Sequence, residues 1–109
     1  MAAANVVEIT DANFESEVTN SETPVLVDFW ATWCQPCLML SPTIDALATE
    51  FAGKVKIGKV NIDQNRQLPV KYRVGAIPTL MIFKGGQLVD TVQGAQSKDR
   101  LTALLNKHL

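Results

Sequence analysis

Residues 25–37 read VLVDFWATWCQPC, and two structural elements meet within them. Residues 25–31 are apolar on both alternating faces apart from Asp28, a pattern typical of a strand that is covered on both sides. Over residues 34–51 the apolar side chains recur at helical spacing, and Gly53 follows as a stop signal. The sequence therefore predicts a central strand that runs directly into the longest helix of the chain.

Segments on either side alternate between strand and helix patterns. Helices are expected after a cap at Thr10 or Asp11, over residues 65–72, and after a cap at Ser97. The sequence KGGQ at residues 84–87 predicts a hairpin, because a Gly-Gly pair suits the primed turns that join antiparallel strands. Further strands are expected over residues 6–9, 55–63, 79–83 and 88–92. Together these patterns predict an α/β fold: a mixed sheet of about five strands, about four flanking helices, and a C-terminal antiparallel hairpin with a final helix.

The composition is that of one ordinary globular domain over residues 1–109. Lys and Arg number 10 against 11 Asp and Glu, with neither sign clustered, which argues against nucleic acid as a partner. No apolar stretch is long enough to span a bilayer and no export signal is visible, so we expect a cytoplasmic protein with no membrane partner. A presequence already removed would leave the same N-terminus, which keeps an organelle open as the location. Nothing in the sequence requires more than a monomer.

Both cysteines of the chain lie where the expected strand passes into the expected helix. Cys34 falls at the helix N-terminus, where free N–H groups and the helix dipole lower the pKa of a thiol, so it is the candidate nucleophile. Cys37 lies one turn further on and shares a helix face with Ile44 and Ala48, so its sulfur should face the interior. It is the candidate resolving thiol. Pro36 is tolerated in the first turn, where its missing N–H would have had no partner.

Three other interpretations of the cysteine pair compete with a redox site. A zinc site needs two ligands besides the cysteines, and His108 is the only other strong candidate in the sequence. His108 is expected in water on the last helical turn. No metal is therefore expected. A purely structural disulfide would close too small a loop to stabilise the fold much, and a chain of 109 residues forms a sufficient core without one. Two inert buried thiols remain an alternative, although the helix start and the adjacent Trp33 favour a reactive pair.

At these positions the sequence resembles the thioredoxin family. The shared stretches follow the family's order and spacing over essentially the whole chain: residues 25–31, Trp33-Cys34 with Pro36-Cys37, Ile77-Pro78-Thr79, Lys84-Gly85-Gly86 and Gly94-Ala95. The resemblance implies the thioredoxin fold and a protein-disulfide reductase without a cofactor. It further implies that the Cys34 thiolate attacks a substrate disulfide and that Cys37 resolves the mixed disulfide by forming a Cys34–Cys37 disulfide. The implied partners are disulfide-containing protein substrates and a thioredoxin reductase that restores the dithiol.

Asp28 is a carboxylate inside a strand that is otherwise apolar on both faces. Burial should desolvate this carboxylate and raise its pKa, unless the strand lies at an edge or Asp28 forms a simple ion pair. The resemblance implies that Asp28 accepts or returns the Cys37 proton through water, with Lys59 on the next strand as its candidate partner. Acids buried beside reactive groups are often tuned in this way.

The resemblance also implies a substrate-binding surface around Cys34. The family's equivalent of Pro78 is cis and packs against the cysteine pair, and the Ile77 backbone would pair with an extended segment of the substrate. A flat apolar rim would bind unfolded or extended protein weakly and broadly, although turn geometry alone accounts equally well for a small residue such as Gly94. The surface comprises Trp33, Gln35, Pro36, Gly75, Ala76, Ile77, Pro78, Gly94 and Ala95.

Two residues depart from the usual family pattern. Gln35 stands where the family usually has glycine, and Leu38 stands where it usually has Lys or Arg. The loss of a nearby cation should modestly disfavour the Cys34 thiolate, and Gln35 adds bulk and an amide at the substrate-facing turn. Both residues therefore affect the reduction potential. They leave two other functions open: a disulfide oxidase or isomerase on the same fold, and a binding subunit that uses the apolar rim without turnover.

Overall fold

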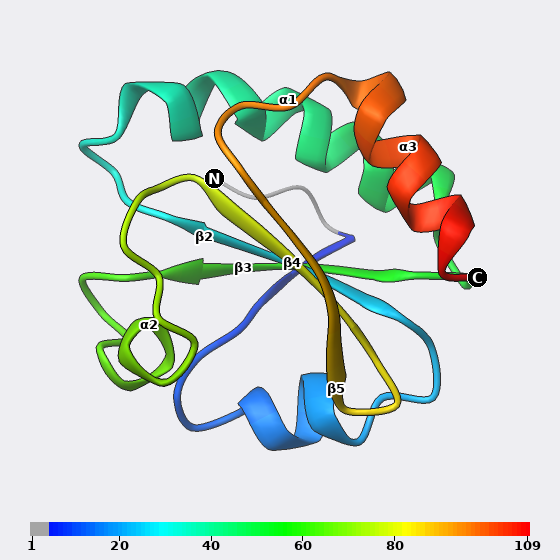
Figure 1. Ribbon diagram of the computed structural model, residues 1–109, viewed down its shortest axis with the longest axis horizontal. Helices are drawn as coiled ribbons and strands as arrows, with labels where there is room; N and C mark the ends of the chain where they lie inside the picture. Colours follow the sequence, from blue (N-terminus) through cyan, green and yellow to red (C-terminus); the bar gives the residue numbers. More distant parts are fainter. Residues whose placement is uncertain (1–4) are drawn as a thin grey trace.

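Residues 25–30 form the central strand of a five-stranded sheet in the computed structural model, which describes residues 5–109 (Figure 1). The elements in chain order are β1 (Val6–Glu8), η1 (Glu15–Thr19), β2 (Val25–Trp30), α1 (Gln35–Glu50), β3 (Lys56–Asn61), α2 (Gln67–Lys71), β4 (Thr79–Lys84), β5 (Gln87–Gln93) and α3 (Lys98–Lys107). The strand order is β1-β3-β2-β4-β5. β1 and β2 run parallel to β3, whereas β4 is antiparallel to both β2 and β5. The predicted mixed sheet with a C-terminal hairpin and final helix is confirmed.

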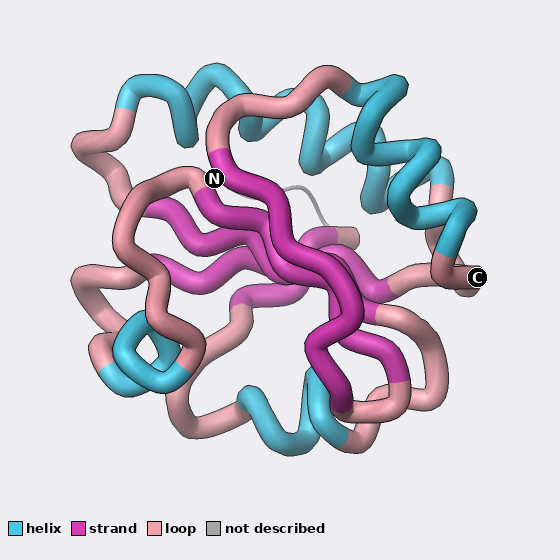
Figure 2. Tube along the Cα trace, viewed as in Figure 1, coloured by secondary structure: helices cyan, strands magenta, loops and turns pink. Residues whose placement is uncertain are grey.

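Helices cover both faces of the sheet. α1 and α3 lie on one face, and η1 and α2 lie on the other (Figure 1, Figure 2). Leu26 of β2 packs in the core beneath α1 and α3, whereas Val27 and Phe29 pack in the core on the opposite face. The near-continuous apolar pattern of β2 thus follows from its enclosure on both sides. Among residues 5–109, no helix is long and apolar enough to cross a membrane.

The long helix α1 begins at the cysteine pair. Cys34 is its N-cap and Phe51 its C-cap, in agreement with the predicted bounds. Leu40 and Ile44 on its inner face are buried in the core between α1 and the sheet. Gly53 follows with a φ of 82°, a left-handed conformation that glycine adopts without steric cost. This packing fixes the first turn of α1 against the end of the central strand.

The predicted hairpin joins β4 to β5. Gly85 and Gly86 form its loop with φ values of 61° and 79°, and positive values at both central positions are what a type I′ turn requires. Ser97 caps α3 as predicted, because its Oγ accepts a hydrogen bond from the N–H of Arg100 at 3.1 Å. The hairpin and the start of α3 therefore follow their local sequence signals.

The predicted helix cap at Thr10 or Asp11 is wrong for both residues, because the N-cap residue of η1 is Phe14, which makes no side-chain cap hydrogen bond. Thr10 Oγ1 accepts a hydrogen bond from Asn13 N–H at 3.1 Å, in a turn that precedes the π-helical η1. The Asp11 carboxylate accepts instead from the N–H groups of Gln67 and Leu68, at 3.2 and 3.0 Å. Asp11 thus caps α2, which lies 56 residues further along the chain. A local sequence pattern carries no sign of such a distant partner.

Replacing Asp11 with alanine should lower the free energy of unfolding by about 1 to 2 kcal/mol, because two N–H groups at the start of α2 lose their acceptor. Urea unfolding followed by tryptophan fluorescence measures the change. Glu22→Ala is the matched control, since Glu22 is an exposed acid in the loop before β2. Equal stabilities for the two variants would contradict this role of Asp11.

His108 does not lie in water at the end of the last helix, as the sequence predicts. Its side chain is mostly buried, and its Nε2 lies 3.1 Å from Asp90 Oδ2 on β5. The hydrogen bond with His108 lowers the pKa of the Asp90 carboxyl. The amphipathic pattern of α3 did not reveal this contact because the two residues meet only when the helix packs against the hairpin. His108 therefore ties the end of α3 to the sheet.

Candidate active site

The two cysteines form a disulfide at the junction of β2 and α1. Their Cα atoms lie 5.2 Å apart, and both residues are buried, Cys34 to 5% exposure and Cys37 to 2%. With Ala31 they form a small apolar cluster against which Trp30 and Ile77 pack. The pair thus sits at the edge of the core, with Cys34 slightly nearer the solvent.

Cys34 occupies the N-terminus of α1 as its N-cap residue. The N–H of Cys37 donates a hydrogen bond to Cys34 Sγ at 3.2 Å, and the intervening Pro36 has no N–H to offer. A backbone N–H and the helix dipole at this position favour a negative charge on the sulfur. The local geometry therefore suits Cys34 to be a thiolate when the disulfide is reduced.

One loop from the C-terminal half of the chain reaches Cys34, and a second loop is hydrogen-bonded to the first. The Ile77 carbonyl oxygen lies 3.8 Å from Cys34 Sγ, and the Ile77–Pro78 peptide bond is cis. Gly94 N–H donates a hydrogen bond to the Pro78 carbonyl at 2.9 Å, which brings the segment after β5 to the same side of the site. The fold thus gathers Ile77, Pro78 and Gly94, three of the residues predicted to bind substrate, around the cysteine pair.

The surface next to Cys34 is exposed and mostly uncharged. Trp33 is 67% exposed, and its Nε1 donates a hydrogen bond to Asp63 Oδ2 at 2.8 Å. Sequence reasoning missed Asp63, because it lies 30 residues from Trp33 and only the fold brings the two together. The other exposed residues of the predicted surface are Gln35, Pro36, Gly75, Ala76 and Ala95.

Asp28 lies in the middle of β2 at 0% exposure, which excludes an edge position. Neither of its carboxylate oxygens has a hydrogen-bond partner within the described residues 5–109. Burial disfavours the charged form and raises the pKa of Asp28 from 3.8 to about 7, although the positive charge of Lys59 acts in the opposite direction. A carboxyl group with this pKa can both give and take a proton near neutral pH.

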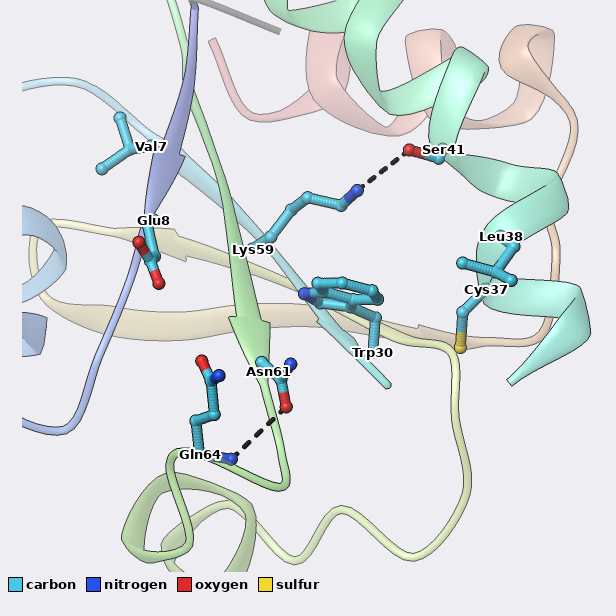
Figure 3. Close-up of a pocket in the computed structure, with 9 residues that line it drawn as sticks. All are labelled: Val7, Glu8, Trp30, Cys37, Leu38, Ser41, Lys59, Asn61 and Gln64. Atoms are coloured by element: carbon cyan, nitrogen blue, oxygen red, sulfur yellow. Dashed lines mark hydrogen bonds between the residues drawn. The ribbon is translucent and has the colours of Figure 1, made fainter. Parts of the chain in front are cut away.

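Lys59 lies beside Asp28 on β3, because the register of the two parallel strands pairs these residues. Its Nζ donates a hydrogen bond to Ser41 Oγ at 3.0 Å and lies 4.9 Å from the centre of the Trp30 ring (Figure 3). Sequence reasoning missed Ser41. Its spacing from Cys37 could have revealed it, because residues four positions apart in a helix lie on the same face.

A cleft of about 260 Å³ opens beside these groups (Figure 3). Cys37, Lys59 and Ser41 lie in its wall, together with Trp30. The cleft is polar enough and large enough to hold water next to Cys37 and Lys59. The rest of its lining consists of Val7, Glu8, Leu38, Asn61 and Gln64.

The chemistry of the site is that of the cysteine pair. A disulfide opens to a dithiol by taking up two electrons and two protons, and thiolate attack interconverts it with other disulfides. In the part of the chain that the structure describes, no group of three His, Cys, Asp or Glu side chains could hold a metal ion. The arrangement therefore supports disulfide exchange, with Asp28 as a nearby group that titrates near neutral pH.

Known proteins resemble this chain over nearly its full length. The family model described as Thioredoxin matches residues 5–107. Thioredoxin 1 of Nostoc sp. is 53% identical over 102 residues, which cover 94% of this chain and 95% of that protein. The thioredoxin of Haemophilus influenzae is 51% identical over 106 residues, covering 97% of this chain and 99% of its own, and that of Pseudomonas aeruginosa is 48% identical over 105 residues, covering 96% and 97%. With the Cys34–Cys37 disulfide at the start of α1, these matches show that the chain is a thiol–disulfide oxidoreductase and belongs to the thioredoxin family.

Proposed function

We propose that Cys34 is the nucleophile and Cys37 the resolving thiol in the reduction of protein disulfides. The Cys34 thiolate attacks one sulfur of a substrate disulfide, forms a mixed disulfide and releases the other substrate sulfur as a thiolate. The Cys37 thiolate then attacks Cys34 Sγ, which releases the second substrate thiolate and closes the Cys34–Cys37 disulfide. The hydrogen bond from Cys37 N–H to Cys34 Sγ carries this assignment, because it favours negative charge on Cys34.

The dithiol supplies both electrons of the reaction. In the net reaction, the two S–H bonds of the dithiol and the S–S bond of the substrate break. One S–S bond forms in the chain and two S–H bonds form in the substrate, so electrons and protons balance. The second step is intramolecular, because Cys37 is tethered beside the mixed disulfide with its Cα atom 5.2 Å from that of Cys34. Little backbone movement separates the two redox states.

Asp28 takes up the proton that Cys37 loses before it attacks, and returns that proton when the disulfide is reduced. Its pKa of about 7 suits both directions near neutral pH. A water molecule carries the proton, since neither Asp28 oxygen bonds to a group in residues 5–109 and the cleft beside Cys37 has room for water. Lys59, which faces Asp28 across the parallel strands, stabilises the ionised carboxylate.

An extended segment of the substrate lies along the loop that contains Ile77. The Ile77 backbone pairs with the substrate main chain, so that the site has little selectivity for the side chains of the substrate. Two contacts support this placement. The Ile77 carbonyl lies beside the sulfur of Cys34, and the Gly94 N–H is bonded to the Pro78 carbonyl. Trp33, Gly75, Ala76 and Ala95 extend the exposed rim on which the substrate rests.

Each turnover leaves the chain oxidised, so an external electron donor must restore the dithiol. We propose a thioredoxin reductase as this donor and the cytoplasm as the compartment, because cytosolic conditions keep thiols reduced. The chain acts as a single domain over residues 1–109 and as a monomer. The family match over residues 5–107 and the single sheet that contains all five strands of the described chain support one domain.

Insulin reduction tests the proposed function. Dithiothreitol replaces the reductase as electron donor, and the native chain should accelerate the precipitation of the freed insulin B chain. A double variant, Cys34→Ser with Cys37→Ser, measures the background. Precipitation by the native chain at the rate of the double variant would refute the proposed function.

Leu38 offers a test of the electrostatics around Cys34. Leu38→Lys should raise the rate at which iodoacetamide alkylates reduced Cys34 at pH 6 by about two- to threefold, because a cation on the first turn of α1 favours the thiolate. Leu38→Gln is the matched neutral control and should leave the rate unchanged. The gain should shrink in 1 M salt, which screens an exposed charge. A gain that salt does not reduce would argue against a charge effect.

A further inference from the structure

Two side chains that carry oxygen, Asp28 and Ser41, lie on elements next to Lys59, and its ammonium donates a hydrogen bond to only one of them. The β2–β3 register places Lys59 beside Asp28. Its Nζ nevertheless donates to Ser41 Oγ on α1 at 3.0 Å (Figure 3). Both oxygens of the fully buried Asp28 carboxyl are left without a partner in residues 5–109.

The hydroxyl and an aromatic ring together hold this ammonium. A cation gains more from an ionised carboxylate than from a neutral hydroxyl, so charge alone would favour Asp28 as the partner. The Trp30 ring, whose centre lies 4.9 Å from Lys59 Nζ, adds a cation–π contact on the cleft side. The Ser41 hydroxyl supplies the hydrogen bond that fixes the direction of the Lys59 side chain within the cleft wall.

We propose that Ser41 is a positioning residue for the dithiol reaction, because its hydroxyl holds the Lys59 ammonium in the cleft wall and so prevents it from pairing directly with the Asp28 carboxyl. This inference rests on the role of Asp28 proposed above. A direct ion pair would stabilise the ionised carboxylate, and such a carboxylate is a weaker base for the Cys37 proton near neutral pH. Ser41 thereby keeps the proton affinity of Asp28 matched to the reaction.

The other titratable groups that face Lys59 are Glu8 and Cys37. Glu8 on β1 is the second register partner of Lys59 and lies in the cleft wall, but it is exposed to solvent. Cys37 on α1 does not titrate while the disulfide is closed. On the far side of β2, the strand β4 pairs the apolar Leu80 with Asp28. The oxidised chain therefore isolates the effect of Ser41 on Asp28.

The test is the titration of Asp28 in the oxidised chain. Aspartate labelled with carbon-13 reports each carboxyl by NMR, and the signal lost in Asp28→Asn assigns Asp28. In Ser41→Ala, which removes only the hydroxyl, the midpoint of the Asp28 titration should fall by about 1 pH unit as Lys59 turns to the carboxylate. Ser41→Thr keeps a hydroxyl and should retain the native midpoint. Thr43→Ala, on α1 but outside the cleft lining, is the matched control and should also retain it.

A second measurement separates this inference from the proposed role of Asp28. In stopped-flow reactions of the reduced chain, the pH profile of the resolving step should move to lower pH in Ser41→Ala by the same amount as the Asp28 titration. An Asp28 midpoint that stays in place or rises in Ser41→Ala overturns the role of Ser41. A resolving-step profile that is unchanged in Asp28→Asn overturns the role of Asp28 instead, whatever the NMR midpoint does.

Discussion

Cys34→Ser should reduce the rate of insulin reduction to that of dithiothreitol alone. A serine hydroxyl does not ionise near neutral pH and cannot form a disulfide, so no mixed disulfide with the substrate can begin the reaction. The Cys37 N–H that now points at Cys34 Sγ cannot compensate, because its acceptor sulfur is no longer present. The apolar rim cannot compensate either, because it only binds the substrate. The loss should be complete rather than partial.

Cys37→Ser is the matched variant, because it removes the second sulfur of the same pair. It should also fail to turn over, but its Cys34 should still react once with a substrate disulfide. Alkylation by iodoacetamide distinguishes the two variants. Cys34 in Cys37→Ser should react faster than Cys37 in Cys34→Ser, because Cys34 lies at the N-terminus of α1, where the Cys37 N–H favours a thiolate, whereas Cys37 lies one turn into the helix. Faster alkylation of Cys37 would reverse the assigned roles.

Asp28→Asn should stabilise the chain by about 4 kcal/mol at pH 8 and leave its stability nearly unchanged below pH 4. The native carboxyl has its pKa raised from 3.8 to about 7, and each pH unit is worth about 1.4 kcal/mol. Between pH 3.8 and 7 the native Asp28 keeps its proton while the unfolded chain has lost it. The free energy of unfolding therefore falls as the pH rises through this window, and the neutral asparagine avoids that loss.

Guanidinium unfolding of the oxidised chain at several pH values measures this difference. Asparagine has nearly the shape of protonated aspartic acid, so packing changes cancel in the comparison. The other carboxyl groups titrate in both proteins and also cancel. A stability difference that does not grow with pH would show that Asp28 is not desolvated in the native state. The same variant should lower the rate of the resolving step at pH 7, because it removes the proton acceptor that we propose for Cys37.

Local sequence signals determine most of this fold. The pattern of residues 25–31 predicts the central strand because both faces of that strand are covered, and the Gly-Gly hairpin and the Ser97 cap depend only on neighbouring residues. The predictions that are wrong involve side chains whose partners are distant. Asp11 caps α2 rather than the next helix, and His108 bonds to Asp90 rather than to water.

The candidate site divides in the same way. The positions of Cys34 and Cys37 follow from where a strand ends and a helix starts, and the burial of Asp28 follows from the apolar pattern around it. The partners of Trp33 and Lys59 could not be predicted, because Asp63 and Ser41 reach them only through the packing of loops and helix on the sheet. Burial can be predicted from periodicity, whereas hydrogen-bond partners between elements cannot.

Trapping of the mixed disulfide identifies the attacking thiol. Reduced Cys37→Ser is mixed with insulin, quenched with acid and digested, and mass spectrometry then locates the cross-link. We expect a stable disulfide between Cys34 and an insulin cysteine, and no comparable adduct on Cys37 in Cys34→Ser. Adducts on Cys37 at equal or greater yield, or no adduct in either variant, would contradict the assignment of Cys34 as the attacking thiol and Cys37 as the resolving one.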